Sequence, residues 1–137
     1  MVWSMASRVF GILAVIAGIE GLALLGYGAF EIVEAIRFGA SGPAAVSSPA
    51  AIMLQIVIFL LFGAGLVLVT RGWLRRSRWV RGPFLLTQFI ALVIGVPLVQ
   101  AAGSVERVVG ILIVLLAVTG IVLTFTRPVI AVFARRD

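Results

Sequence analysis

The sequence predicts an all-α fold, a four-helix transmembrane bundle with both termini in the cytoplasm. Hydrophobic residues make up 63% of the 137 residues and charged residues only 12%, whereas soluble domains are roughly 45–50% apolar and about 25% charged. The mean hydropathy is +1.27. The apolar residues form four long stretches, each close to the roughly 20 residues that a membrane-crossing helix needs. Because these stretches lack alternating polarity, they do not fit the strands of a membrane barrel.

The first predicted span covers residues 9–36, and a single carboxylate, Glu20, interrupts its apolar part. Residues 39–49, with the sequence GASGPAAVSSP, are small and uncharged. Since Gly and Pro break helices, this segment is expected to be a loop. Ser48 followed by Pro49 matches the N-cap and first position of a second helix.

The other predicted spans are residues 50–70, 84–101 and 105–126 of the same integral membrane domain, which covers residues 1–137. Pro97 falls in the last turn of the third span, where a proline bends or loosens a helix. Gly103 and Ser104 are expected to form a tight turn, with Ser104 as the N-cap of the fourth span. Arg127-Pro128 marks the end of that span and leaves a short tail at the interface.

Arginine placement predicts the orientation, because cytoplasmic loops carry an excess of basic residues. With both termini inside, the inner side holds nine arginines and the outer side holds two, Arg37 and Arg107. The net charge of +6 is therefore interpreted as a topology signal and not as a nucleic-acid surface. The use of arginine alone, without lysine, is typical of a GC-rich bacterial genome, so a bacterial cell membrane is the expected location.

Glu20 is the most informative residue of the sequence. It lies about 18 Å along the first helix from Arg8, near the bilayer midplane, where a carboxylate costs at least about 2.5–3.5 kcal/mol. Tyr27, Glu31 and Glu34 follow at spacings that place all four residues within about 60° of one another around the helix. This polar stripe is a candidate helix-contact or proton site. The sequence leaves three alternative roles open for Glu20: it hydrogen-bonds within the bundle, it contacts another subunit, or it carries a proton or cation.

A second face of the first helix carries small residues, and small residues allow another helix to approach closely. This candidate close-packing set lies about a quarter-turn from the polar stripe and consists of Ala14, Ala17, Gly21 and Gly28.

The segment between the second and third spans is rich in arginine and tryptophan. Its candidate contacts for anionic lipid headgroups or an acidic partner are Arg71, Arg75, Arg76, Arg78, Arg81, Trp73 and Trp79. Each basic side chain near an anionic surface contributes about 1 kcal/mol, and guanidinium groups bind carboxylates and phosphates in bidentate fashion. The plainer interpretation is a positive-inside signal with an aromatic belt, and the two interpretations are compatible.

The composition excludes several kinds of chemistry. The chain has no His and no Cys, which removes His-based triads, thiol catalysis and haem ligation through those residues. No phosphate-binding glycine loop is recognisable among the scattered glycines. The sequence therefore predicts no metal site, no cofactor and no enzymatic activity.

Two resemblances bear on function. The stretch RGWLRRSRWVRGPFLLTQ resembles a segment of small four-span membrane proteins of actinobacterial type, which implies a bacterial membrane and no particular activity. The chain also resembles the small multidrug resistance family in size, span number and a Glu in the first span, which Glu20 would match. It departs from that family because its third span has Phe84 and Phe89 but no Trp or Tyr, and because its arginine bias favours one fixed orientation.

The expected function is that of a non-enzymatic accessory or scaffold subunit of a larger membrane complex. Its expected partners are anionic headgroups of the inner leaflet and other membrane subunits or further copies of the chain, with no nucleic acid. The alternative is a proton-coupled small-molecule transporter that acts as an oligomer, with Glu20 as the carrier.

Overall fold

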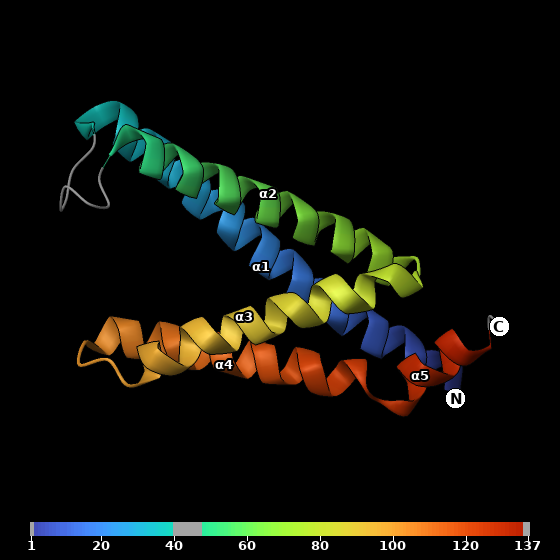
Figure 1. The fold of residues 1–137 in the computed structure, drawn as a ribbon. Coiled ribbons are helices and arrows are strands. Elements are labelled where there is room, and N and C mark those ends of the chain that lie inside the picture. The colour runs from blue at the N-terminus through green and yellow to red at the C-terminus, as the bar shows by residue number, and fades with distance from the viewer. Residues whose placement is uncertain (1, 40–47, 136–137) are drawn as a thin grey trace. The chain divides into compact units, whose positions relative to one another are not determined.

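The computed structural model describes residues 2–39 and 48–135, and these are helical apart from short turns and caps (Figure 1). The helices are α1 (Val2–Phe38), α2 (Pro49–Leu74), the short 3₁₀ helix η1 (Arg78–Val80), α3 (Arg81–Val99), α4 (Ser104–Thr124) and α5 (Arg127–Ala134). Among the described residues, four helices are long and apolar enough to cross a membrane, which confirms the predicted number of spans. Most of the predicted loop at 39–49 lies outside the described residues.

The helix ends agree with the sequence where the signal is local. The Ser48 Oγ accepts a hydrogen bond from the Ala51 N–H at 3.2 Å, so Ser48 caps α2 as predicted. Gly39 takes a left-handed conformation (φ 67°) after α1, and its N–H donates to the Ala35 carbonyl. Glycine is the residue that adopts this helix-ending conformation without strain.

The start of α4 differs from the prediction by one residue. Gly103 is the N-cap and Ser104 is already helical, without a side-chain capping bond. The Glu106 carboxylate folds back over Gly103 and occupies the space that a Cβ would need there. On the other side of the turn, the Arg107 guanidinium donates to the Ala101 carbonyl at 3.1 Å. The predicted capping bond of Ser104 is therefore not formed, and the Glu106 and Arg107 side chains lie against the turn.

The ends of α3 and α4 also differ slightly from the predicted spans. Helix α3 ends at Val99, after Pro97, and the Gln100 N–H donates to the Pro97 carbonyl in a tightened last turn. Helix α4 ends at Thr124. The Arg127-Pro128 pair then begins a further helix, α5, because proline fits the first turn of a helix. The predicted tail is therefore helical over Arg127–Ala134.

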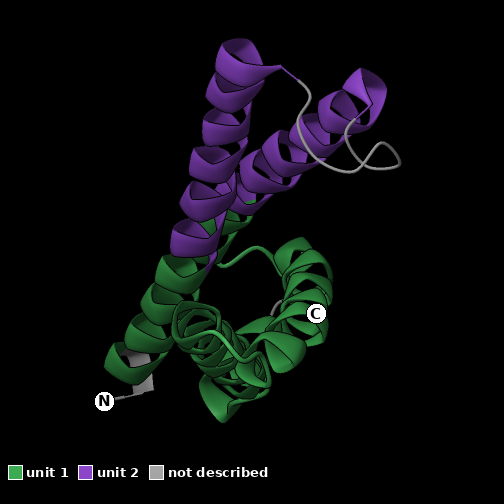
Figure 2. Ribbon diagram, turned by 90° about the vertical axis from the view of Figure 1, so that its left-hand side faces the viewer, with its two compact units in different colours: residues 1–16, 69–137 green, residues 17–68 purple. Residues whose placement is uncertain are grey.

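The chain divides into two compact units, residues 1–16 with 69–137 (unit 1) and residues 17–68 (unit 2) (Figure 2). Unit 2 is a hairpin of the larger parts of α1 and α2, which run antiparallel. A Cβ added to Gly21 would lie 3.1 Å from the Gly63 carbonyl oxygen, and one added to Gly28 would lie 3.0 Å from a Leu60 methyl. Helices in lipid associate by such close packing at small residues.

Unit 1 is built around the antiparallel α3–α4 hairpin. Gly110 faces Leu98 and Val99, and Gly120 faces Phe84 and Gln88. At the end where α3 begins, the unit closes around buried aromatic side chains, while the outer faces of its helices expose apolar residues such as Val93 and Val105. Those exposed apolar faces suit a hydrocarbon environment, in keeping with a multi-pass membrane protein.

Candidate functional site

A buried aromatic cluster lies at one end of unit 1. The Trp73 ring is fully buried and packs against Phe10, Phe84 and Phe133, with centroid distances of 5.8, 5.4 and 6.3 Å. Phe10 and Phe133 also meet edge to face at 5.8 Å. Aromatic pairs of this kind contribute about 0.5–1.5 kcal/mol each beyond the area that they bury. The cluster therefore joins the beginning of α1, the end of α2, the beginning of α3 and α5.

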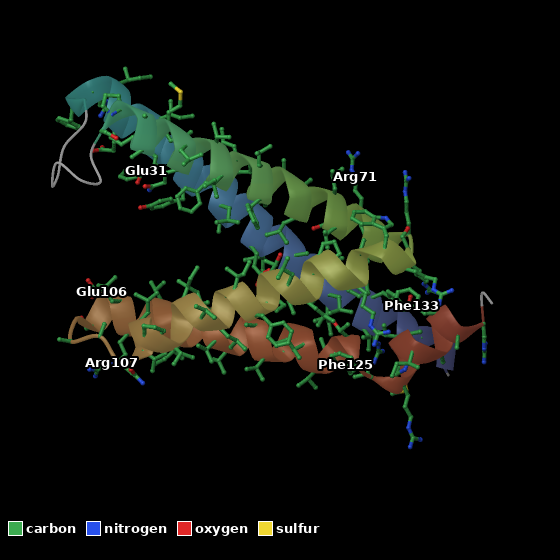
Figure 3. All side chains as sticks on the ribbon, viewed as in Figure 1. Glu31, Arg71, Glu106, Arg107, Phe125 and Phe133 are labelled. Atoms are coloured by element: carbon green, nitrogen blue, oxygen red, sulfur yellow. The ribbon has the colours of Figure 1, made fainter. Side chains whose placement is uncertain are left out.

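Arginines lie close to this cluster along the chain, and we refer to the group as the arginine end. It consists of Arg8, Arg71, Arg75, Arg76, Arg78, Arg81, Arg127 and Arg135. Each lies within five residues along the chain of a ring in the cluster or of Phe125, at the end of α4. Glu106 is the only acidic residue in the described part of unit 1, and it lies at the opposite end of the α3–α4 hairpin (Figure 3).

Two of these arginines stack on aromatic rings. The guanidinium carbon of Arg76 lies 5.4 Å from the centre of the Phe10 ring, and that of Arg81 lies 5.0 Å from the centre of the Phe125 ring. Cation–π contacts contribute about 0.5–1 kcal/mol at exposed sites and about 2 kcal/mol when desolvated. Both arginines are half-buried, whereas Arg71, Arg75 and Arg78 are exposed.

The two tryptophans of the arginine-rich segment have different environments. Trp79 is 56% exposed, as expected for a residue at a membrane interface, but Trp73 is fully buried. The expectation that Trp73 contacts lipid headgroups or a partner is therefore corrected, because its ring is enclosed by three phenylalanines. Its indole Nε1 is buried and makes no hydrogen bond with the described residues.

The predicted polar stripe of α1 is only partly at the surface. Tyr27 is 47% exposed, its hydroxyl hydrogen-bonds the Glu31 carboxylate, and its ring meets Phe59 of α2 edge to face at 5.1 Å. Glu31 and Glu34 are half-buried. Glu20 is also half-buried and has an interaction partner. The Tyr27 part of the stripe thus contacts the neighbouring helix of its own hairpin.

The predicted close-packing residues are all buried: Ala14, Ala17, Gly21 and Gly28. Within unit 2, the helix that approaches Gly21 and Gly28 is α2. At Gly21 and Gly28, the small-residue face of α1 is therefore covered by α2 of the same hairpin.

Sequence reasoning did not single out the phenylalanines that organise the arginine end. Phe10, Phe125 and Phe133 each lie two residues from an arginine, and Phe84 lies three residues after Arg81. This repeated closeness of phenylalanine to arginine along the chain was the signal that could have revealed the cluster.

No group of three or more potential metal ligands is found among the described residues. Comparisons with protein-family models, with curated proteins and with solved structures find no match to this chain.

Proposed function

We propose that this protein is a non-enzymatic, small integral membrane subunit that serves as an accessory or scaffold in a larger membrane complex and contacts both protein and anionic lipid. The observation that carries the proposal is the arginine end of unit 1. It gathers eight arginines in one part of the unit, and Arg71, Arg75 and Arg78 among them are exposed. Such a surface is stabilised by negative charge from outside the unit.

Two sources of negative charge fit this surface. Phosphates of an anionic leaflet attract each nearby arginine by about 1 kcal/mol, and carboxylates of a partner subunit accept bidentate hydrogen bonds from guanidinium groups. By the excess of basic residues on the cytoplasmic side, we place the arginine end and both termini there, in a bacterial cell membrane.

The polar end of the unit 2 hairpin offers a second contact surface for a protein partner. Tyr27 and Phe30 are both about half exposed, their rings lie 6.2 Å apart, and the Tyr27 hydroxyl is joined to Glu31. Aromatic side chains with a polar group are enriched where proteins meet. This surface therefore supports a subunit contact beside the lipid contact of the arginine end.

Purification in mild detergent at native expression tests the accessory role. The wild-type chain is expected to bring down a partner in fixed stoichiometry. Replacing the exposed Arg71, Arg75 and Arg78 together by Gln should reduce that recovery, whereas Arg107→Gln, at the other end of the α3–α4 hairpin, should not. Recovery of the wild-type chain with lipid alone would count against the proposal.

A proton-coupled transporter acting as an oligomer is the second candidate. The favouring observation is that Glu20 is a half-buried carboxylate within an apolar helix, and a carboxylate at membrane depth is a frequent proton carrier. In liposomes, Glu20→Gln should abolish pH-dependent uptake of cationic test compounds, while the matched Glu31→Gln variant should retain it. Equal uptake by the wild type and Glu20→Gln would remove this candidate.

A further inference from the structure

Gln55 is an exposed polar side chain on the otherwise apolar helix α2. Residues 49–69 of this helix contain no charged residue, and Gln55 carries their only side-chain amide. It lies 16 residues before Arg71, which is about 24 Å along the helix axis. This length is shorter than the roughly 30 Å of the hydrocarbon core. With Arg71 at the headgroups, Gln55 therefore falls within the hydrocarbon.

The amide of Gln55 has a hydrogen-bonding capacity that lipid tails do not meet. A glutamine amide carries two N–H donors and a carbonyl acceptor, whereas hydrocarbon offers neither donors nor acceptors. Thr119 is a useful contrast, because this exposed hydroxyl of α4 donates to the Leu115 carbonyl of its own helix at 2.7 Å. Glutamine side chains in membranes are instead stabilised by hydrogen bonds across to another helix.

Gln55 lies on a side of α2 that does not meet α1. The side of α2 that meets α1 contains Gly63, which lies opposite Gly21. At 100° per residue, Gln55 is about 80° around the helix from Gly63. Ile58 and Phe62 follow Gln55 at i+3 and i+7 and are 44% and 47% exposed. These three side chains form one continuous exposed ridge along the helix, which we refer to as the Gln55 face.

We propose that the Gln55 face binds a second copy of this chain, and that the two Gln55 amides hydrogen-bond to each other across the contact. Copies inserted in the same orientation hold Gln55 at the same depth, and a two-fold axis along the membrane normal places the residue opposite itself. Because an amide is both donor and acceptor, each Gln55 donates to the other and accepts from it. The face carries no charge that would repel an identical partner.

Oxidative cross-linking of single cysteines in membranes locates the contact, because the chain contains no cysteine of its own. Ile58 and Val57 are equally exposed, at 44% each, and as neighbours they lie at nearly equal depth. Ile58 belongs to the Gln55 face, whereas Val57 lies about 160° around the helix from Gln55. Copper phenanthroline should therefore link copies of Ile58→Cys into a disulfide dimer but not copies of Val57→Cys. Equal cross-linking of both variants, or of neither, would overturn the proposal.

Energy transfer between copies measures what the amide itself contributes. The purified full-length chain, labelled at Ser104→Cys with a donor or an acceptor dye, is reconstituted in liposomes at a series of lipid-to-protein ratios. Gln55→Leu should weaken association roughly tenfold, the size expected of interhelical hydrogen bonds in a bilayer. Gln100→Leu removes another exposed amide, at the end of α3, and should leave association unchanged. Unchanged association for Gln55→Leu, or an equal loss for both variants, would overturn the proposal.

This inference goes beyond the proposed function, whose contacts lie at the arginine end and around Tyr27. The measurements use only copies of this chain, so a failure to find a different partner protein leaves the Gln55 contact standing. If the Gln55 face binds a different subunit instead, the purified wild-type chain shows no energy transfer between its copies. That result overturns the pairing of Gln55 with itself and leaves the accessory role standing.

Discussion

Arg76 ends α2 in an unusual way for an arginine. The Ser77 N–H donates to the Gly72 carbonyl at 2.8 Å and the Arg76 N–H donates to the Trp73 carbonyl at 3.0 Å. This pair of bonds is the Schellman motif, whose left-handed position is usually glycine. Here Arg76 adopts φ 55°, which costs a side-chain-bearing residue roughly 1–2 kcal/mol. Its stacking on Phe10 offsets part of that cost.

Two substitutions of Arg76 separate backbone strain from stacking. Arg76→Ala keeps the strained conformation and loses the cation–π contact, so it should be less stable than the wild type by about 0.5–1 kcal/mol. Arg76→Gly also loses the contact but relieves the strain, so it should be more stable than Arg76→Ala by about 1 kcal/mol. Unfolding free energies in detergent micelles provide the comparison. Equal stability of the two variants would show that the left-handed conformation carries no strain.

At the residue scale, the sequence indicated which side chains are unusual but not which of them are buried. Trp73 and Trp79 both lie in an arginine-rich segment and are indistinguishable by composition. Trp73 is enclosed because Phe10 and Phe133, distant in the sequence, meet around it. Contacts between residues far apart along the chain leave no local pattern. The sequence alone therefore could not predict that Trp73 is buried while Trp79 is exposed.

At the element scale, the helices were predicted well where their ends depend on neighbouring residues. Ser48 caps α2 as expected because an N-cap bond spans only three residues. The predicted cap of α4 was wrong by one residue, since Gly103 is the N-cap, with the Glu106 carboxylate beside it. Helix α5 was missed as a helix because eight residues give too short a pattern to read. In the structure, helix α5 is held by the burial of its Val129 and Phe133 side chains.

The small-residue face of α1 illustrates what helical spacing provides and what it does not. A spacing of seven residues places Gly21 and Gly28 on one face, which predicts close approach of another helix. It does not reveal which helix approaches. The structure has α2 there, with Gly63 directly opposite Gly21.

Two glycines of α2 provide a matched test of the α1–α2 contact. A Cβ at Gly63 would lie 3.0 Å from the Gly21 carbonyl oxygen and 2.7 Å from a Leu25 side-chain carbon, whereas nothing lies within 4 Å of one at Gly65. Gly63→Ala should therefore destabilise the protein by about 1–3 kcal/mol, as overpacking does. Gly65→Ala should be neutral or slightly stabilising, because alanine favours helix. The prediction fails if the two variants unfold at the same denaturant concentration.

The α3–α4 contact is expected to be even less tolerant. A Cβ at Gly110 would lie 2.6 Å from the Val99 backbone nitrogen and 2.8 Å from the Leu98 carbonyl carbon. Backbone atoms cannot rotate away as a side chain can, so Gly110→Ala must push the two helices apart. We expect thermal unfolding at a clearly lower temperature than for Gly82→Ala in α3, where a Cβ meets nothing within 4 Å. An unchanged melting temperature for Gly110→Ala would contradict this packing.

At the scale of the whole molecule, hydropathy fixes the number of spans, and packing fixes how they associate. The four apolar stretches are predicted to be helices because lipid requires every backbone group to be bonded within its own segment. The division of the chain into unit 2, the α1–α2 hairpin, and unit 1 depends on glycines and phenylalanines whose contact partners are remote in sequence. The arginine end combines both kinds of information, since its charges are visible in the sequence and its aromatic support is not.

The proposed orientation of the chain, with the arginine end in the cytoplasm, is open to direct measurement. The chain contains no cysteine, so a single introduced thiol reports its own side of the membrane. Ser77 is suitable at the arginine end because its described hydrogen bond to Gly72 uses the backbone N–H, and Ser104 is an exposed residue in the turn region between α3 and α4. Since basic residues favour the cytoplasmic side, a membrane-impermeant maleimide should label Ser104→Cys in intact cells and Ser77→Cys only after permeabilisation. Labelling of Ser77→Cys but not Ser104→Cys in intact cells would show that the orientation is the opposite one. Labelling of both variants in intact cells would show that α3 does not cross the membrane.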